Sequence, residues 1–266
     1  MKKLSRIYVA LILMFLYVPI FVLIVFSFNE TKSRSVFSGF TLDWYARLFN
    51  NDIIISSLIN TLIIAVLASV ASTILGTLAA IGINGMRKVP KAVIMNVTNM
   101  PIINPEIVTG VSLMLLFVFF AARMHLEFGF VTLVIAHITF DVPYVILNIM
   151  PKFKQMDPHL YEAAQDLGCS PFQAFKRVIL PEIMPGVISG FLMAFTYSLD
   201  DFVISYFTSG STSQTLPITI YSMTRRKISP EINALSTLIF VVVVVVLIVK
   251  NIIENRQAKK RGLYRG

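Results

Sequence analysis

Residues 7–28, "IYVALILMFLYVPIFVLIVFSF", form an apolar run without a charged side chain. A helix needs about 20 mostly apolar residues to cross a bilayer, and this run has that length. The basic residues of "MKKLSR" precede it, as in a signal peptide. However, the apolar run exceeds the usual length of about 7–15 residues, and no small-x-small cleavage site follows. We therefore expect a retained membrane-spanning helix.

The rest of the chain has the same character. Of its 266 residues, 56% are hydrophobic and 14% are charged, and the mean hydropathy is +0.77, which is too apolar for a soluble domain of this size. We expect an all-α integral membrane protein with a single transmembrane domain over residues 1–266. Six stretches have the length of a span, namely 7–28, 58–83, 93–122, 129–150, 182–207 and 232–253.

The distribution of Lys and Arg predicts the orientation of these spans. With a cytoplasmic N-terminus, the inside segments hold most of the 23 Lys and Arg residues, as the positive-inside rule requires. Both termini are then cytoplasmic. The net charge of +9 gathers beside the predicted spans, where membrane topology and anionic lipid account for it, so we expect no nucleic-acid partner.

Four carboxylates lie well inside the predicted spans, Glu106, Asp141, Asp200 and Asp201, and Glu182 lies at the cytoplasmic start of the fifth span. No Lys or Arg lies within the core of any predicted span, and an unpaired acid there costs about 2.5–3.5 kcal/mol on insertion scales. A cationic ligand that passes through the protein would account for all four acids. Two alternatives stay open at this point, protonation of the acids and pairing with basic residues of a second subunit.

The neighbours of these acids form polar stripes. His137, Asp141, Tyr144 and Asn148 share one face of the fourth span, and Tyr197, Asp201, Ser205 and Thr208 share one face of the fifth. On a regular helix, Asp200 is rotated by about 100° from Asp201, so both face one point only if the helix is broken. The predicted substrate-path residues are Asp201, Asp200, Asp141, Glu106, Tyr197, Tyr144 and Ser205.

Proline interrupts the third predicted span, at Pro101 and again at Pro105. Asn104-Pro105-Glu106 reads as a fresh helix start within the bilayer, and broken helices of this kind line cavities in transporters. Outside the spans, "GFTLDWYARLF" at 39–49 predicts an interfacial helix on the outer surface. Its apolar residues are Phe40, Leu42, Trp44, Tyr45 and Leu48.

Motifs for catalysis and metal binding are absent from the sequence. It contains no G-x-x-x-x-G-K-[ST] phosphate loop, no G-x-S-x-G and no H-E-x-x-H, and its three histidines fall in different segments. The single cysteine, Cys169, allows no intrachain disulfide. We expect neither an enzyme nor a metal site nor a bound cofactor, and ATP, if it drives transport, must be bound by another subunit.

The loop over 151–181 is strongly punctuated. Asp157 and Pro158 fit the start of a short helix, and Gly168 fits the left-handed residue that ends it. Ser170 and Pro171 repeat the start signal, and the second apolar stripe continues to Pro181. The spacing indicates two short helices that meet at a glycine corner, which suits either a docking element for a soluble partner or a capped, solvated loop.

Residues 162–181, "EAAQDLGCSPFQAFKRVILP", resemble the EAA loop of ABC importer permeases: Glu-Ala-Ala, three residues, Gly, nine residues, Ile, one residue, Leu-Pro. Val178 replaces the Ile of that pattern. The resemblance implies the six-helix type I (MetI-like) permease bundle, in which 151–181 forms a coupling helix that docks on the ATPase subunit. The residues it assigns to this coupling are Glu162, Ala163, Ala164, Asp166, Gly168 and Pro181.

Within that family the chain is similar to permeases of spermidine/putrescine importers, through "SLDDFVISYFTSG" at 198–210, "GFTLDWYARLFNND" at 39–52 and "SPEINALSTL" at 229–238. The similarity implies a polyamine substrate and a place in the bacterial inner membrane. It also implies as partners a second homologous permease, two ATP-binding subunits and an extracytoplasmic polyamine-binding protein. The alternatives are a permease for another small solute, an ion-coupled secondary cation transporter, and a metal-dependent membrane enzyme.

Overall fold

The computed structural model describes residues 2–31, 36–124, 127–157, 159–211, 213–226, 230–241 and 244–245, and within them the chain is almost entirely helical. The β-structure in these residues is an isolated antiparallel bridge between Asn29 and Phe40. The helices are α1 (Lys2–Phe26), α2 (Asp43–Phe49), α3 (Asp52–Asn84), α4 (Lys88–Ile103), α5 (Glu106–Met124), α6 (Phe130–Gln155), α7 (Leu160–Asp166), α8 (Pro171–Ala174), the π-helix η1 (Phe175–Ile179), α9 (Leu180–Asp200), α10 (Val203–Thr208) and α11 (Leu216–Arg226).

Five helical segments in the described residues are long and apolar enough to cross a membrane: Arg6–Phe26, Asp52–Asn84, Glu106–Arg123, Phe130–Gln155 and Pro171–Asp200. They correspond to the first five predicted spans. The sixth prediction, 232–253, lies partly outside the described residues, and its described part begins with a shorter apolar helix over Pro230–Val241. The count of six spans stays a prediction.

Two of the predicted spans are not single helices. In 93–122 the helix ends at Ile103, Asn104 is extended (φ −77°, ψ 134°) and α5 begins at Glu106. The predicted interruption is therefore confirmed at Pro105, whereas Pro101 lies inside α4. In 182–207 the expectation of a continuous helix was wrong, because α9 ends at Asp200 and α10 begins at Val203.

The chain divides into two units, residues 1–55 with 220–266, and residues 56–219. In the first unit, a tight connection joins α1 to α2. The indole Nε1 of Trp44 donates to the backbone oxygen of Asn29 at 2.7 Å, and the ring of Phe28 stacks on that of Phe40 at 5.2 Å. The predicted helix within 39–49 is confirmed as α2, with Trp44 and Leu48 buried. A single domain over 1–266 stays a prediction.

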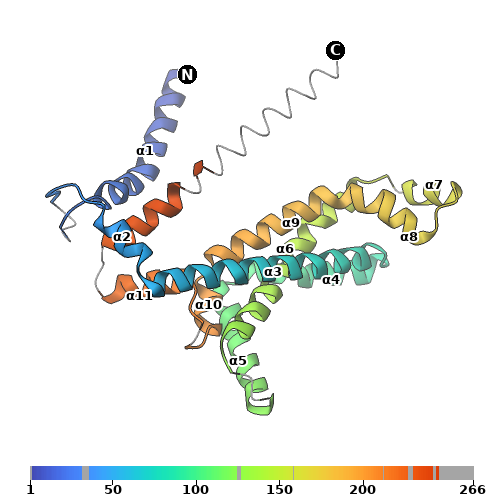
Figure 1. The fold of residues 1–266 in the computed structure, drawn as a ribbon. Helices are drawn as coiled ribbons and strands as arrows, with labels where there is room; N and C mark the ends of the chain where they lie inside the picture. Colours follow the sequence, from blue (N-terminus) through green and yellow to red (C-terminus); the bar gives the residue numbers. More distant parts are fainter. Residues whose placement is uncertain are drawn as a thin grey trace. The chain divides into compact units, whose positions relative to one another are not determined.

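The second unit contains the candidate site. Helices α3, α4, α6 and α9 lie alongside one another, with α7 and α8 at one end and α5 and α10 at the other (Figure 1). A first hydrophobic core joins α3, α6, η1 and α9, and a second joins α5, α6 and α10. Helix α6 takes part in both cores and is the central element of this unit.

Glycines let the neighbours approach α6 closely. A Cβ atom on Gly76 of α3 would lie 2.7 Å from side-chain carbons of Val145, and one on Gly186 of α9 would lie 2.9 Å from the backbone oxygen of Asn148. Gly190, one turn further along α9, faces the backbone of Val145. Small residues at helix contacts permit such close packing in membrane proteins. The position of α9 against α6 is thereby fixed.

Candidate functional site

The polar stripe of α6 faces α9. Asp141 Oδ2 accepts a hydrogen bond from Ser198 Oγ at 2.8 Å, and the rings of Tyr144 and Tyr197 meet with centroids 4.6 Å apart. One turn further, Asn148 Nδ2 donates to the sulfur of Met193 at 3.4 Å. The predicted stripe on the fourth span therefore exists, and it lies in a helix–helix contact.

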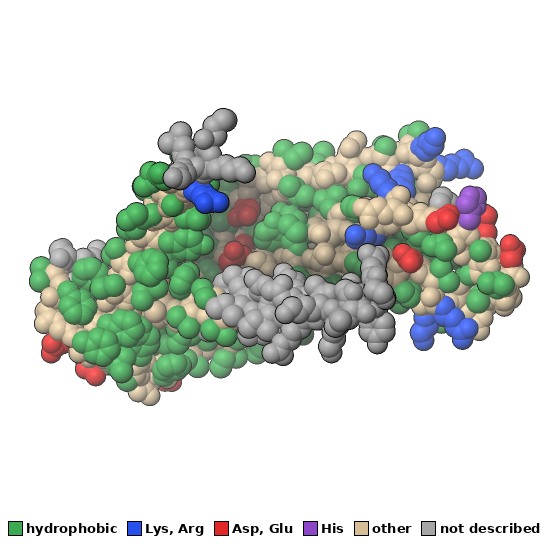
Figure 2. All heavy atoms as spheres, turned by 90° about the horizontal axis from the view of Figure 1, so that it is seen from above, with side chains coloured by type: hydrophobic (Ala, Val, Ile, Leu, Met, Phe, Trp, Pro, Cys, Tyr) green, Lys and Arg blue, Asp and Glu red, His purple; other side chains and the backbone are tan. Residues whose placement is uncertain are grey.

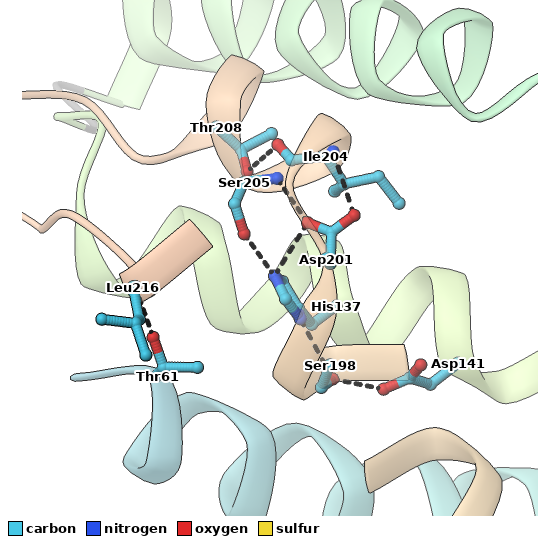
Figure 3. A network of polar contacts seen from close by, with 9 residues as sticks. All are labelled: Thr61, His137, Asp141, Ser198, Asp201, Ile204, Ser205, Thr208 and Leu216. Atoms are coloured by element: carbon cyan, nitrogen blue, oxygen red, sulfur yellow. Dashed lines mark hydrogen bonds and ion pairs between the residues drawn. The ribbon is translucent and has the colours of Figure 1, made fainter. Parts of the chain in front are cut away.

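His137 lies at the centre of a buried polar network (Figure 3). Its Nδ1 is 3.0 Å from Ser198 Oγ, and its Nε2 is 3.0 Å from Ser205 Oγ and 3.6 Å from Asp201 Oδ2. The His137 side chain is 2% exposed. One imidazole ring thus connects the last turn of α9 with the first turn of α10.

Asp201 causes the break between these two helices. Its backbone is extended (φ −62°, ψ 122°), and its carboxylate accepts the backbone N–H groups of Ile204 at 3.2 Å and Ser205 at 2.7 Å. An Asp side chain that binds nearby N–H groups competes with the helical ladder and favours a new helix start. This local competition is the reason that the predicted continuous span failed.

We use the name joint for five residues that meet at this break: His137, Asp141, Ser198, Asp201 and Ser205. Asp141 is 0% exposed, and its Oδ1 has no hydrogen-bond partner among the described residues. The Asp201 side chain is 5% exposed. Two of the four acids predicted for the substrate path are therefore enclosed by protein.

The other two acids lie on the surface. Asp200, the last residue of α9, and Glu106, the first residue of α5, are both exposed. Glu106 lies within electrostatic range of the Tyr144 ring, which packs with Phe140 and Tyr197 in one aromatic cluster. Within the described residues, no group of three or more His, Cys, Asp or Glu side chains could hold a metal ion.

Ser198 and the central position of His137 were not predicted from the sequence. The spacing of His137 and Asp141 placed both on one helix face, but Ser198 becomes their partner only through the packing of α6 against α9. Thr132 was missed for the same reason: its Oγ1 donates to the backbone oxygen of Thr208 at 2.8 Å. Tyr197 is half-buried and Ser205 is fully buried, in two different helices.

A second candidate site is the elbow, which we define as residues 159–179. Helix α7 ends in a Schellman motif, in which the N–H of Gly168 bonds to Gln165 O at 2.8 Å and that of Cys169 to Ala164 O at 3.1 Å. Gly168 has φ 85°, as predicted for a left-handed glycine. Ser170 and Gln173 then form a reciprocal capping box at the start of α8.

Two details of the elbow differ from the prediction. Helix α7 begins at Leu160, with His159 at the N-cap position, and Asp157 Oδ1 accepts the backbone N–H of His159 at 2.9 Å. Pro158, the predicted first helical residue, lies outside the described residues. The second helix does not end at Pro181. It continues through the π-helix η1 into α9, where Leu180 N–H bonds to Phe175 O. The wider turn accommodates a proline that cannot donate to the ladder.

Charged side chains of both signs gather at the end of the second unit that contains the elbow (Figure 2). Glu162 and Asp166 are exposed, as are Ala163 and Pro181, whereas Ala164 is buried against the rest of the elbow. Two large apolar side chains also point outward, Leu167 (87% exposed) and Phe172 (73% exposed). Exposed apolar side chains on a surface that also carries charged residues are typical of a protein contact surface.

Comparisons with known proteins agree with this architecture. Residues 72–261 match the family model described as "binding-protein-dependent transport system inner membrane component". The spermidine/putrescine transport system permease protein PotC of Shigella flexneri is 36% identical over 248 residues, covering 93% of this chain and 92% of PotC. The putrescine transport system permease protein PotI of Escherichia coli (strain K12) is 39% identical over 258 residues, covering 93% and 89%.

Among solved structures, a bacterial ABC transporter involved in the import of the acidic polysaccharide alginate superposes with a TM-score of 0.70 at 13% identity, over 96% of this chain and 95% of that chain. An amino acid ABC transporter superposes with a TM-score of 0.52 at 22% identity, over 78% and 98%. These likenesses concern the fold, and they confirm the prediction of an all-α permease. The chain belongs to the family of binding-protein-dependent transport system inner membrane components.

Proposed function

We propose that this chain is a permease subunit of an ATP-driven ABC importer for polyamines such as spermidine and putrescine, and that it forms half of the translocation path. The observation that carries the proposal is the set of acids in the membrane-spanning helices of a chain whose relatives are polyamine permeases. A linear polycation requires negative charge along its route, and no Lys or Arg lies within the cores of the spans to neutralise these acids.

Within this proposal the four acids have different roles. Asp200 and Glu106 are exposed, so their carboxylates are free to meet an ammonium group. Asp141 and Asp201 are enclosed in the joint, where they accept hydrogen bonds from Ser198 and from the start of α10. We assign direct contact to the first pair and shaping of the path to the second.

The aromatic cluster supports a cationic substrate. Tyr144 and Tyr197 lie beside each other and Glu106 is within electrostatic range of Tyr144. Aromatic faces attract alkylammonium groups by about 0.5–2 kcal/mol, depending on desolvation. The pair of rings offers a face for the ammonium and methylene groups of a polyamine.

For the elbow we propose docking on an ATP-binding subunit. The exposed Glu162, Ala163 and Asp166 would contact that subunit, and Gly168 and Pro181 would hold the geometry of the contact. The complete importer would then contain a second homologous permease, two ATPases and an extracytoplasmic polyamine-binding protein. The elbow and both termini would lie in the cytoplasm. The chain itself would be non-catalytic and bind no cofactor.

The direct test is uptake of labelled spermidine and putrescine by a polyamine-starved host that carries this chain with its partner subunits. Asp200→Asn and Glu106→Gln each remove one exposed charge without changing shape. We expect each to raise the half-saturation concentration about tenfold, the equivalent of one charge-assisted contact. The matched control is Asp52→Asn, an exposed acid at the start of α3.

The comparison with wild type requires that both charge variants assemble with the ATPase. Co-purification of the ATPase with each variant tests this assembly. Wild-type half-saturation in both would remove these acids from the path. If the wild-type complex takes up neither polyamine but another solute, the importer stands and its substrate is wrong.

A further inference from the structure

We propose that His137 is a positioning residue that locks the break between α9 and α10, and thereby determines that Asp200 faces outward while Asp201 faces inward. The contact of Asp200 with substrate rests on the proposed function. The bonds of His137 to Ser198 and Ser205, which we call the lock, do not depend on that function. The inference stands on the geometry of the joint, in which one buried ring contacts residues on both sides of the break.

The two ring nitrogens of His137 serve different helices. Nδ1 meets Ser198, in the last turn of α9, and Nε2 meets Ser205, in the first turn of α10, each at 3.0 Å. Between them the backbone leaves the helical conformation at Asp201. Backbone hydrogen bonds do not pass continuously through the break, so this side chain replaces them as a mechanical connection.

Helix α10 needs such a connection because it has only six residues. A helix of that length is not stable by itself in the absence of packing. That packing comes from α5 and α6: Ile204 joins the core of both helices, Gly110 of α5 allows the close approach of Phe207, and Thr132 of α6 binds the Thr208 carbonyl. His137 lies outside α9 and α10, and its ring contacts a serine in each of them.

The donors and acceptors of the network are mutually consistent. Ser198 has one hydroxyl proton, which it donates to Asp141 Oδ2 at 2.8 Å. Ser198 Oγ then accepts from the Nδ1–H of His137, which leaves Nε2 to accept from the hydroxyl of Ser205. We assign this tautomer because it satisfies every polar atom of the ring in a buried site.

The lock explains the opposite exposure of two adjacent acids. With α10 held by His137, the Asp201 carboxylate accepts the backbone N–H groups of Ile204 and Ser205 and points into the protein. Asp200, at the end of α9, is left on the surface. Without the ring, α10 loses the contact that sets its angle to α9, and with it the fixed direction of both carboxylates.

The test uses the complete complex in lipid nanodiscs, with hydrogen–deuterium exchange read on peptides that cover residues 196–209. His137→Ala should speed exchange there by about tenfold, the factor expected when one or two buried hydrogen bonds are lost. His137→Gln, whose amide offers one donor and one acceptor, should restore most of the protection. The matched control is Thr139→Val, since Thr139 bonds only to Ile135 of its own helix.

The second measurement is the kinetics of polyamine uptake by the same variants. His137→Ala should raise the half-saturation concentration for polyamine about tenfold with a maximal rate close to wild type, and His137→Gln should recover most of it. A fall in maximal rate at unchanged half-saturation would overturn the positioning role, as would exchange equal to that of Thr139→Val.

Two variants keep the test decisive. Where His137→Ala does not assemble, Ser205→Ala removes only the bond on the α10 side, and the same exchange increase at 203–208 is expected. Exchange needs no substrate, so it decides the lock independently of the polyamine. Absence of polyamine uptake by wild type, with the exchange difference present, would reject the proposed substrate and retain the lock.

Discussion

The elbow and the joint both redirect the chain between helices, and they are held in opposite ways. At the elbow, the motifs that close α7 and open α8 are hydrogen bonds between residues three to five positions apart. At the joint, the bonds of His137 and Asp141 connect residues 57, 61 and 68 positions apart. The elbow is exposed and the joint is buried. Local backbone motifs build a surface for contact, and long-range side-chain bonds fix a point inside the bundle.

The largest effect is expected just beyond the joint, at Gly210. Its φ is 64°, and a Cβ there would fall on the backbone carbonyl of Phe128. Gly210→Val combines this overlap with backbone strain of about 1–3 kcal/mol, so we expect little assembled protein in the membrane. The measurement is the fraction of complex extracted as a single species in detergent. Gly82→Ala, with nothing within 4 Å of the new Cβ, should assemble normally, and normal assembly of Gly210→Val would contradict the close packing.

At the elbow, Gly168 separates backbone conformation from packing. Its φ is 85°, yet a new Cβ would meet nothing within 4 Å. Gly168→Val should therefore distort only the elbow and reduce uptake about tenfold or more, with normal membrane insertion. Gly168→Asn, which tolerates the left-handed region, should retain most uptake. Uptake and substrate-stimulated ATP hydrolysis at wild-type levels in the Val variant would show that the elbow geometry is not used for coupling.

A smaller effect is expected from the buried hydroxyl of the joint. Ser198→Ala removes the proton donated to Asp141 and leaves the Nδ1 of His137 without a partner. Leaving buried polar groups unpaired costs about 1–3 kcal/mol. Thermal unfolding of the purified complex should show the loss as a lower midpoint. An unchanged midpoint would mean that the joint contributes nothing to stability.

The smallest effect is expected from the corresponding serine at the elbow. Ser170→Ala removes an exposed helix cap, which costs about 1 kcal/mol locally. Because the elbow is a surface element, we expect the unfolding midpoint of the complex to stay close to wild type while proteolysis at 159–175 becomes faster. A drop in midpoint as large as that of Ser198→Ala would remove the distinction between the two regions.

The same distinction explains what the sequence could predict. Gly168, Ser170 and Pro171 were correctly assigned because glycine and capping residues act on their immediate neighbours. The apolar spans were recognised for the similar reason that their length and hydrophobicity are local properties. Pro105 was correctly placed at a helix start, because the missing N–H has an effect within one turn.

The errors arose where a side chain competes with the backbone or reaches another helix. Asp201 appeared as one position in an apolar helix, and nothing nearby in the sequence shows that its carboxylate would cap Ser205. Pro181 looked like a helix end, but a π-turn absorbs it. The partnership of His137 with Ser198 depends on the packing of α6 against α9, which glycines on α9 permit and which no local pattern records.

We propose that ATP drives polyamine import through this chain in the complete complex and that the chain does not transport by itself. The most direct measurement is accumulation of labelled spermidine in proteoliposomes that contain this chain with its partner permease, the ATPases and the binding protein. We expect accumulation that requires ATP and every subunit, and none with this chain alone. Uptake by the chain alone, driven by an ion gradient without ATP, would contradict it.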